Sequence, residues 1–378
     1  MELYPILYLL RLQATASSIP ISQLKIVDLM SGSGFLAENL YKVGYHNLHA
    51  IEFCEAMCQD AQIYANQVRL HRIASFAHLE GYLEEINPDV IVSLASFHHL
   101  LCCNDENGVD LHASISLQKN VVDICMRSLS GSGLLVIADL IEENVRETMF
   151  PDSDHIMSRV LQDLMSLGMP REILDNIKKC RSIQGASSII SRALCCRTDN
   201  MSLKWFRNVV DVKTSIGHKD IAISETLLEK LKVYDPCIAK YRCPWIFNNK
   251  EEQSSFLYHK FGFALDSGTS GAVLPTDVSA MAEKELGVKN LHGKSLLGWN
   301  LGVIAIWKTS PFESARCFRY LVLCLLLLIG LLSVALFSRL LFELYVKPSW
   351  GGALIFTMTF LLGMIFGEII QSMSRKPK

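Results

Sequence analysis

The stretch IVDLMSGSG at residues 26–34 decides the fold of the first part of the chain. It begins inside a short apolar run, residues 24–29, whose β-forming side chains predict a buried strand. A glycine-containing turn at residues 30–34 follows, and residues 35–43 then show helical spacing of apolar side chains. Glycine lets the backbone of such a turn approach a ligand, and the following helix presents unpaired N–H groups to it. This arrangement predicts a nucleotide-binding loop.

The same alternation of strand and helix continues along the chain. Further strands and helices are expected, in alternation, at residues 48–53, 54–68, 90–94, 120–129 and 134–138. Strands that alternate with helices form a parallel sheet through right-handed crossover connections. In such a sheet, ligands bind at the carboxyl ends of the strands, where Asp28 and Glu52 lie. An ionised carboxylate at Glu52 could accept hydrogen bonds from both hydroxyls of a ribose.

Two kinds of nucleotide fit the glycine turn. Residues 32–37 match the dinucleotide pattern G-x-G-x-x-G/A, with the acid Glu52 about 20 residues downstream. Asp28, however, lies directly before the turn. A pyrophosphate would have to tolerate this carboxylate, whereas a cationic ligand is attracted by it. The residues therefore favour a sulfonium or an amino-acid-bearing nucleotide over NAD.

Several segments in order resemble the motifs of class I S-adenosylmethionine (SAM)-dependent methyltransferases, in the small-molecule branch that includes quinone and sterol methyltransferases. They are residues 26–34, HAIEFCEAM at 49–57, PDVIVSLASFHHL at 88–100 and LSGSGLLVIAD at 129–139. WNLGVIAIWK at residues 299–308 resembles the last strand of that family's sheet, which is antiparallel. The resemblance implies an α/β fold with a Rossmann-like, mostly parallel sheet, SAM as cofactor, and methyl transfer as the reaction.

The resemblance also implies a cofactor site at the strand ends. Glu52 would bind the ribose, and backbone groups of the fourth strand would hold the methionine part. The full set of expected cofactor residues is Asp28, Met30, Ser31, Gly32, Gly34, Glu52, Phe53, Ser93 and Ala95. Two features depart from the family pattern. Met30 stands where the first loop glycine is usual, and Ala74 and Ser75 stand where an adenine-contacting acid is often found.

His98 and His99 are the expected catalytic residues. They lie at the end of a predicted strand, beside the position expected for the methyl group. An oxygen or nitrogen acceptor needs a base, and a histidine side chain suits that role. Because the two are adjacent, one should point into the site and the other into the body of the protein. The alternative is that both only pack or brace the cofactor loop.

Composition and charge exclude other classes of function. Hydrophobic residues make up 50% of the 378 residues, which rules out a disordered chain. The formal net charge is -2, so no overall basic field exists for binding nucleic acid. The 12 cysteines form no C-x-x-C pair, which favours reduced cytosolic thiols. No metal site is expected, because adjacent ligands such as His98, His99, Cys102 and Cys103 rarely converge on one ion.

Two apolar segments near the C-terminus predict a membrane anchor. As helices, residues 320–341 would span about 33 Å and residues 353–370 about 27 Å, at about 1.5 Å per residue. Arg316 and Arg319 precede the first segment, and Arg375 follows the second. The positive-inside rule therefore places both ends of this hairpin, and the catalytic domain, in the cytosol. Buried core helices of a soluble domain are the alternative.

The expected organisation has a core, an insertion, a closing strand and a transmembrane hairpin, at residues 1–140, 141–298, 299–312 and 318–372. The insertion is expected to be long and helical and to form a substrate lid, or else a separate interaction domain. One of its helices is expected at residues 224–233, capped by Ser224. The apolar residues 5–10 lack a preceding basic residue, so a helix packing on the body is expected there rather than a signal peptide.

These features predict a methyltransferase that acts on a small or lipid-like acceptor at the cytosolic membrane face, with the bilayer as partner and no nucleic acid. The acceptor and the oligomeric state cannot be read from the residues. A catalytically degenerate, membrane-tethered scaffold is one alternative, motivated by Met30 and the missing adenine-side acid. An NAD-dependent oxidoreductase is a further one, disfavoured by Asp28 and the two histidines.

Overall fold

The structure of the chain is a computed structural model. It describes residues 2–55, 57–58, 67–102, 109–142, 144–148, 150–169, 171–178, 222–242, 245–260, 280, 283, 288–291, 293–297, 300–309, 330, 333, 336 and 339. The chain divides into two compact units, Met1–Ser310 and Pro311–Lys378. All of the helices and strands named below belong to the first unit.

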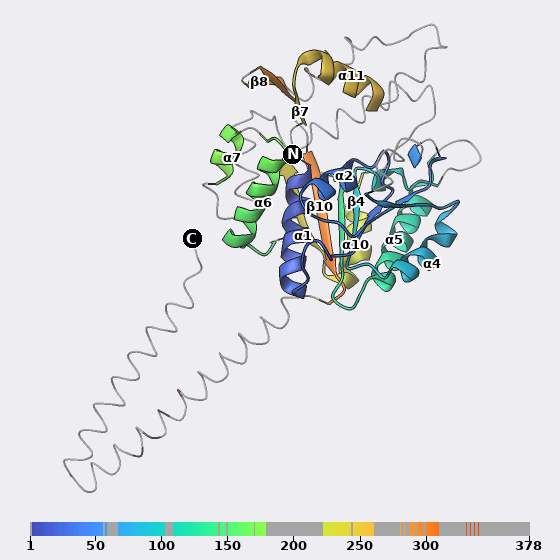
Figure 1. The fold of residues 1–378 in the computed structure, drawn as a ribbon. Coiled ribbons are helices and arrows are strands. Elements are labelled where there is room, and N and C mark those ends of the chain that lie inside the picture. Colours follow the sequence, from blue (N-terminus) through green and yellow to red (C-terminus); the bar gives the residue numbers. More distant parts are fainter. Residues whose placement is uncertain are drawn as a thin grey trace, which may run out of the picture. The chain divides into compact units, whose positions relative to one another are not determined.

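A seven-stranded sheet forms the centre of the first unit (Figure 1). Its spatial order is β3 (Arg69–Arg72), β2 (Leu48–Glu52), β1 (Ile26–Leu29), β4 (Val90–Leu94), β5 (Leu134–Asp139), β10 (Asn300–Trp307) and β6 (Cys237–Arg242). The strands from β3 to β5 pair in parallel, and β10 is antiparallel to both β5 and β6. The predicted α/β fold, with a mostly parallel sheet and an antiparallel last strand, is confirmed.

Helices cover both faces of the sheet. One face packs against α4 (Leu79–Ile86), α5 (Leu111–Ser128) and α10 (Glu225–Leu231) through apolar side chains that alternate along the strands. Val27, Ile91, Ile137 and Ile304 belong to this core. In α10, the Oγ atom of Ser224 accepts a hydrogen bond from the Leu227 N–H, as expected for its cap. The remaining helices are α1 (Leu3–Ser17), α2 (Phe35–Lys42), α6 (Asp154–Ser166), α7 (Arg171–Ile177) and α11 (Lys250–Lys260).

Helix α1 is a buried element of the body and contacts α6 and β5. The Arg11 guanidinium makes two hydrogen bonds to the Asp163 carboxylate of α6, at 2.9 and 2.6 Å. Near its other end, the Gln13 side chain accepts from the Trp307 indole of β10 and donates to the Ser132 carbonyl. The expected packing of residues 5–10 on the body is therefore observed, with residues 3–10 and 12–14 of the helix buried.

The segment between β5 and β10 is not wholly helical, so that expectation was wrong. Besides α6, α7, α10 and α11 it contributes β6 to the main sheet, and it forms a second sheet in the order β7 (Trp245–Phe247), β9 (Lys294–Leu297), β8 (Val288–Leu291). The reason is local. Residues 237–247 are rich in aromatic and β-branched side chains, which favour strands when a partner strand is available.

In the part of the chain that the structure describes, no helix has both the length and the apolar character needed to cross a bilayer. The segments predicted to do so, residues 320–341 and 353–370, lie outside the described residues except for Gly330, Ser333, Leu336 and Arg339. The membrane anchor therefore stays a prediction.

Candidate active site

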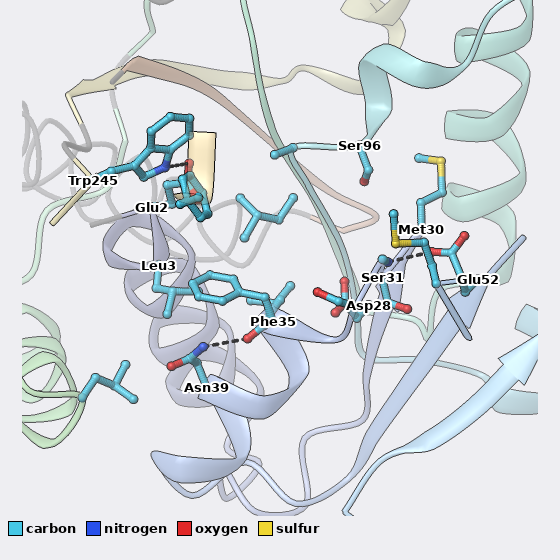
Figure 2. A pocket seen from close by; sticks show the side chains of 18 of the residues that line it. Glu2, Leu3, Asp28, Met30, Ser31, Phe35, Asn39, Glu52, Ser96 and Trp245 are labelled. Atoms are coloured by element: carbon cyan, nitrogen blue, oxygen red, sulfur yellow. Dashed lines mark hydrogen bonds between the residues drawn. The ribbon is translucent and has the colours of Figure 1, made fainter. Parts of the chain in front are cut away.

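A cavity of about 1190 Å³ lies at the carboxyl ends of β1, β2 and β4 (Figure 2). Eight of the expected cofactor-binding and catalytic residues line this cavity: Asp28, Met30, Ser31, Gly32, Glu52, Phe53, Ala95 and His99. Gly34, Ser93 and His98 are not among the residues that line it. Gly34 begins helix α2, and the Ser93 Oγ atom is buried 3.0 Å from that of Ser96, which does line the cavity.

The turn after β1 has left-handed backbone at three alternate positions. Met30, Gly32 and Gly34 have φ angles of 57°, 56° and 85°. Glycine adopts this region without strain, whereas a side chain such as that of Met30 costs about 1–2 kcal/mol there. The Met30 side chain also lines the cavity. The departure from the family pattern at this residue is therefore accommodated by the backbone at a local energetic cost.

Glu52 ties the end of β2 to the glycine turn. Its Oε2 atom accepts from the Gly32 N–H at 2.6 Å, and Oε1 accepts from the N–H groups of Phe53 and Cys54 at 2.7 and 2.8 Å. The carboxylate is thereby fixed at the edge of the cavity. Two carboxylate oxygens offer about four acceptor positions, so capacity remains for hydroxyl donors of a ligand.

Asp28 is a buried carboxyl group in the same part of the cavity. Burial raises its pKa to about 7; a hydrogen bond from the Ala37 N–H opposes this rise, and the nearby Glu52 charge adds to it. Among the described residues, neither Oδ2 of Asp28 nor Oγ of Ser31 has a hydrogen-bond partner. Buried polar atoms without partners are rare and are satisfied by a ligand at many functional sites. A cationic group there would favour the ionised form of Asp28.

Two aromatic rings lie beside Glu52. The ring of Phe53 is 4.0 Å from that of Phe76, centroid to centroid, with 31° between the planes, and both side chains line the cavity. Phe76 follows β3 closely, in the short helix Phe76–His78. The expected position of an adenine-contacting acid is two and one residues earlier, at Ala74 and Ser75. The sequence did not single out Phe76, although an aromatic residue directly after the third strand was the available signal.

The two adjacent histidines have different environments. His98 is buried, with Nδ1 2.7 Å from Oδ1 of Asp139, and its backbone N–H donates to Oδ2 at 3.0 Å. Burial raises the pKa of Asp139, but the His98 charge and hydrogen bonds outweigh it and hold the pKa below its usual value. His99 lines the cavity, and its ring centroid lies 4.0 Å from that of His98. One histidine thus faces the cavity, and the other is anchored in the sheet.

The far end of the cavity is largely apolar and comes from distant parts of the chain. It is lined by the beginning of α1, the end of α6 and the loop after it, strand β7 and helix α11, through Glu2, Leu3, Leu164, Leu167, Gly168, Met169, Trp245, Ile246, Phe247, Glu252 and Phe256, together with Lys294 of β9. Figure 2 shows Glu2 and Trp245 well separated from Asp28, Ser31 and Glu52. None of these residues was singled out, because their proximity depends on tertiary packing.

No metal-binding arrangement is seen in this region. The described His, Cys, Asp and Glu side chains form no group of three or more that could hold an ion. Cys103, which was considered with His98, His99 and Cys102, lies outside the described residues.

Comparison with known proteins yields structural similarity alone. No protein-family model matches the chain, and no curated protein matches it. Among solved structures, the YcgJ protein of Bacillus subtilis is 10% identical with a TM-score of 0.34, covering 78% of this chain and 97% of that one. A putative methyltransferase of Bacillus halodurans is 12% identical with a TM-score of 0.34, covering 79% and 99%.

A SAM-bound aminopentose methyltransferase, CalS10 of Micromonospora echinaspora, is 15% identical with a TM-score of 0.27. The match covers 38% of this chain and 54% of that protein, so the chain spans about half of its length. The fold is defined by the strand order and directions given above, which are those of a mostly parallel, Rossmann-like α/β sheet with strand β10 antiparallel.

Proposed function

We propose that this chain is a SAM-dependent methyltransferase that acts on a small or lipid-like acceptor at the cytosolic face of a membrane. The observation that carries the proposal is the cavity. Its polar end joins the buried Asp28, the Glu52 carboxylate and two aromatic rings at the carboxyl ends of the strands. Its other end has the apolar walls that a hydrophobic acceptor needs.

The residues at the polar end fit each part of SAM. Glu52 would accept hydrogen bonds from the ribose hydroxyls, and Phe53 and Phe76 would pack against the adenine ring. The unpartnered atoms of Asp28 and Ser31 would face the cationic methionine part. When bound, SAM supplies an electrophilic methyl group, so the protein's main tasks are to orient the acceptor and to exclude water.

His99 is proposed as the base that removes a proton from the acceptor atom. It is the histidine whose side chain lines the cavity, and an imidazole is well suited to accept a proton at a ring nitrogen. His98 would act through its neighbour, because the Asp139 carboxylate fixes the orientation of its ring and the ring packs against His99.

Calorimetric titration of the full chain with SAM tests the cofactor assignment. Unaltered protein should bind SAM, and Glu52→Gln should weaken binding at least tenfold because one oxygen acceptor is lost. Glu55→Gln is the matched control, since Glu55 is exposed and pairs with Arg72 outside the cavity. A folded protein without SAM binding, or a Glu52→Gln variant that binds as tightly as the unaltered chain, would overturn the proposal.

A catalytically degenerate scaffold is the second candidate. It is favoured by the left-handed Met30, whose side chain lines the cavity, and by Ala74 and Ser75 in place of an acid. The discriminating result is a folded chain that binds no SAM, combined with full cellular function of the Glu52→Ala variant.

The membrane location is proposed from residues 320–341 and 353–370 and from the basic residues that flank them. A glycosylation acceptor site inserted in the predicted loop, near Trp350, should be modified in microsomes, and a C-terminal tag should be digested by added protease. Release of the chain by alkaline carbonate, or glycosylation of a C-terminal site instead, would contradict the predicted topology.

A further inference from the structure

Glu2 places a carboxylate at the apolar end of the cavity. The residue is only 8% exposed, and its side chain lines the cavity beside Leu3 and Trp245. Among the described residues, its one hydrogen-bond donor is the Trp245 indole, with Nε1 2.7 Å from Oε1. In the described part of the chain, Glu2 is therefore a buried acid whose hydrogen-bond partner is a neutral indole.

A buried carboxylate needs compensation. Removing a carboxylate from water costs several kcal/mol unless a cation and further hydrogen bonds replace the lost hydration. Lys294 is the only Lys or Arg among the described residues that line the cavity, and it forms no ion pair with Glu2 in this structure. The other acid there, Glu252, is exposed and accepts from the Asn248 N–H at the start of α11.

The walls around Glu2 are apolar and aromatic. Leu3 and Leu164 are buried, and the Trp245 ring packs edge-on against Phe256 at 5.2 Å. A group that enters beside Glu2 therefore exchanges water for apolar walls and meets the Glu2 carboxylate. In such surroundings an ammonium group is favoured over a neutral hydroxyl, because the attraction between opposite charges is strongest where the dielectric constant is low.

We infer that Glu2 is a specificity-determining residue that binds a basic nitrogen on an otherwise apolar acceptor. The inference rests on the proposed function, since it names the acceptor class for the same cavity. Trp245 is the positioning residue, because its indole N–H holds the carboxylate in place. The nitrogen serves here as an anchor, and no bond to it forms or breaks at Glu2.

Two probes of matched shape test the inference: 4-phenylbutylamine and 4-phenylbutan-1-ol. Binding of each to the full chain, carrying its tag at the C-terminus and held in phosphatidylcholine nanodiscs, is measured by calorimetry with empty nanodiscs subtracted. The amine should bind at least tenfold more tightly than the alcohol. In Glu2→Gln that preference should disappear, with alcohol binding changed less than twofold.

Glu251→Gln is the matched control, because it removes the same charge from an exposed position on α11 outside the cavity lining and should keep the preference. Trp245→Phe should reduce the preference severalfold and offers a second variant if Glu2→Gln does not fold. Equal binding of the two probes, no binding of either, or an unchanged preference in folded Glu2→Gln would overturn the inference. SAM titration of the same samples is independent of this result, so failure of the cofactor assignment is recognised separately.

Discussion

The two ends of the cavity are built in opposite ways. The polar end is made by a short part of the chain, with Asp28 and Glu52 at neighbouring strand ends and backbone N–H groups fixing the Glu52 carboxylate. The apolar end is made by side chains from α1, α6, β7 and α11, which meet only in the folded protein. An end built from neighbouring strand ends and their backbone groups suits a ligand that does not vary. An end built from side chains of separate elements can acquire a different ligand by substitution, without disturbing the sheet.

The largest expected effect comes from removing the Asp28 charge. Because its pKa is raised from 3.8 to about 7, ionisation of Asp28 opposes folding. At about 1.36 kcal/mol per pKa unit, that opposition reaches about 4 kcal/mol above pH 7, grows between about pH 4 and 7, and is absent below that range. Asp28→Asn should therefore increase the free energy of unfolding at pH 8 by up to about 4 kcal/mol, while weakening SAM binding.

Urea denaturation at pH 4.5 and pH 8 checks the Asp28 prediction. Glu229→Gln, at an exposed acid paired with Lys232, is the control and should show the same stability as the unaltered chain at both pH values. If Asp28→Asn changed the free energy of unfolding equally at the two pH values, ionisation of Asp28 would not destabilise the folded state and the prediction would be wrong.

The second effect separates the two histidines. His98→Phe leaves Asp139 buried without its side-chain partner, so the free energy of unfolding at neutral pH should fall by about 3 kcal/mol. The deficit should shrink in acid, because the lowered pKa of Asp139 gives a stabilisation that is lost once the carboxylate is protonated. His99→Phe should cost less than about 0.5 kcal/mol.

For the rate of methyl transfer, the larger direct effect is expected from His99→Phe and the smaller one from His98→Phe. His99→Phe should lower the single-turnover rate at least about 100-fold, the range for loss of a general base. Chemical denaturation and rate measurements on both variants together check this pair of predictions. A His99→Phe enzyme with an unchanged rate would leave that residue with a packing role alone.

A smaller effect is expected at the apolar end. Leu167→Asn places a polar group on the cavity wall and should weaken binding of 4-phenylbutan-1-ol about tenfold, in line with about 1.5 kcal/mol for a buried apolar side chain. SAM affinity should change less than twofold, because Leu167 lies away from the strand ends. Leu111→Asn, at an exposed apolar residue outside the cavity lining, is the control. If SAM binding falls as much as alcohol binding, the two ends are not independent.

The smallest effect is expected at Met30. Met30→Gly removes a side chain from a left-handed position, a relief of about 1–2 kcal/mol that is partly offset by the greater freedom of glycine in the unfolded chain and by the lost contact of the Met30 side chain with the core. The melting temperature should rise slightly, by the equivalent of at most about 1 kcal/mol. Thermal unfolding beside Gly131→Ala, whose added methyl group has free space around it, gives the comparison. A destabilised Met30→Gly would show that its side chain supports the loop.

What could be predicted from the sequence follows the same division. The alternation of strands with helices and the placement of Asp28 and Glu52 depend on local patterns, apolar runs followed by glycine turns, and these can be recognised in the sequence. Which of His98 and His99 faces the cavity depends on Asp139, forty-odd residues away, and could be stated only as an alternative. Glu2 gave no pattern at all, because its role comes from contacts across the fold, and the position of Phe76 after the third strand was the one signal for that residue.

The position of β10 between β5 and β6 has a consequence for synthesis on the ribosome. Strand β5 ends at Asp139, but β10, the strand that pairs with the edge of β5 opposite β4, begins only at Asn300. Throughout translation of the intervening segment β5 is an open, apolar sheet edge, the kind of surface that recruits other strands and aggregates. Strand β6 must also wait, since among the described strands its partner in the sheet is β10. A nascent chain stalled before residue 300 should therefore depend on chaperones, and one stalled well beyond residue 307 should be far less dependent.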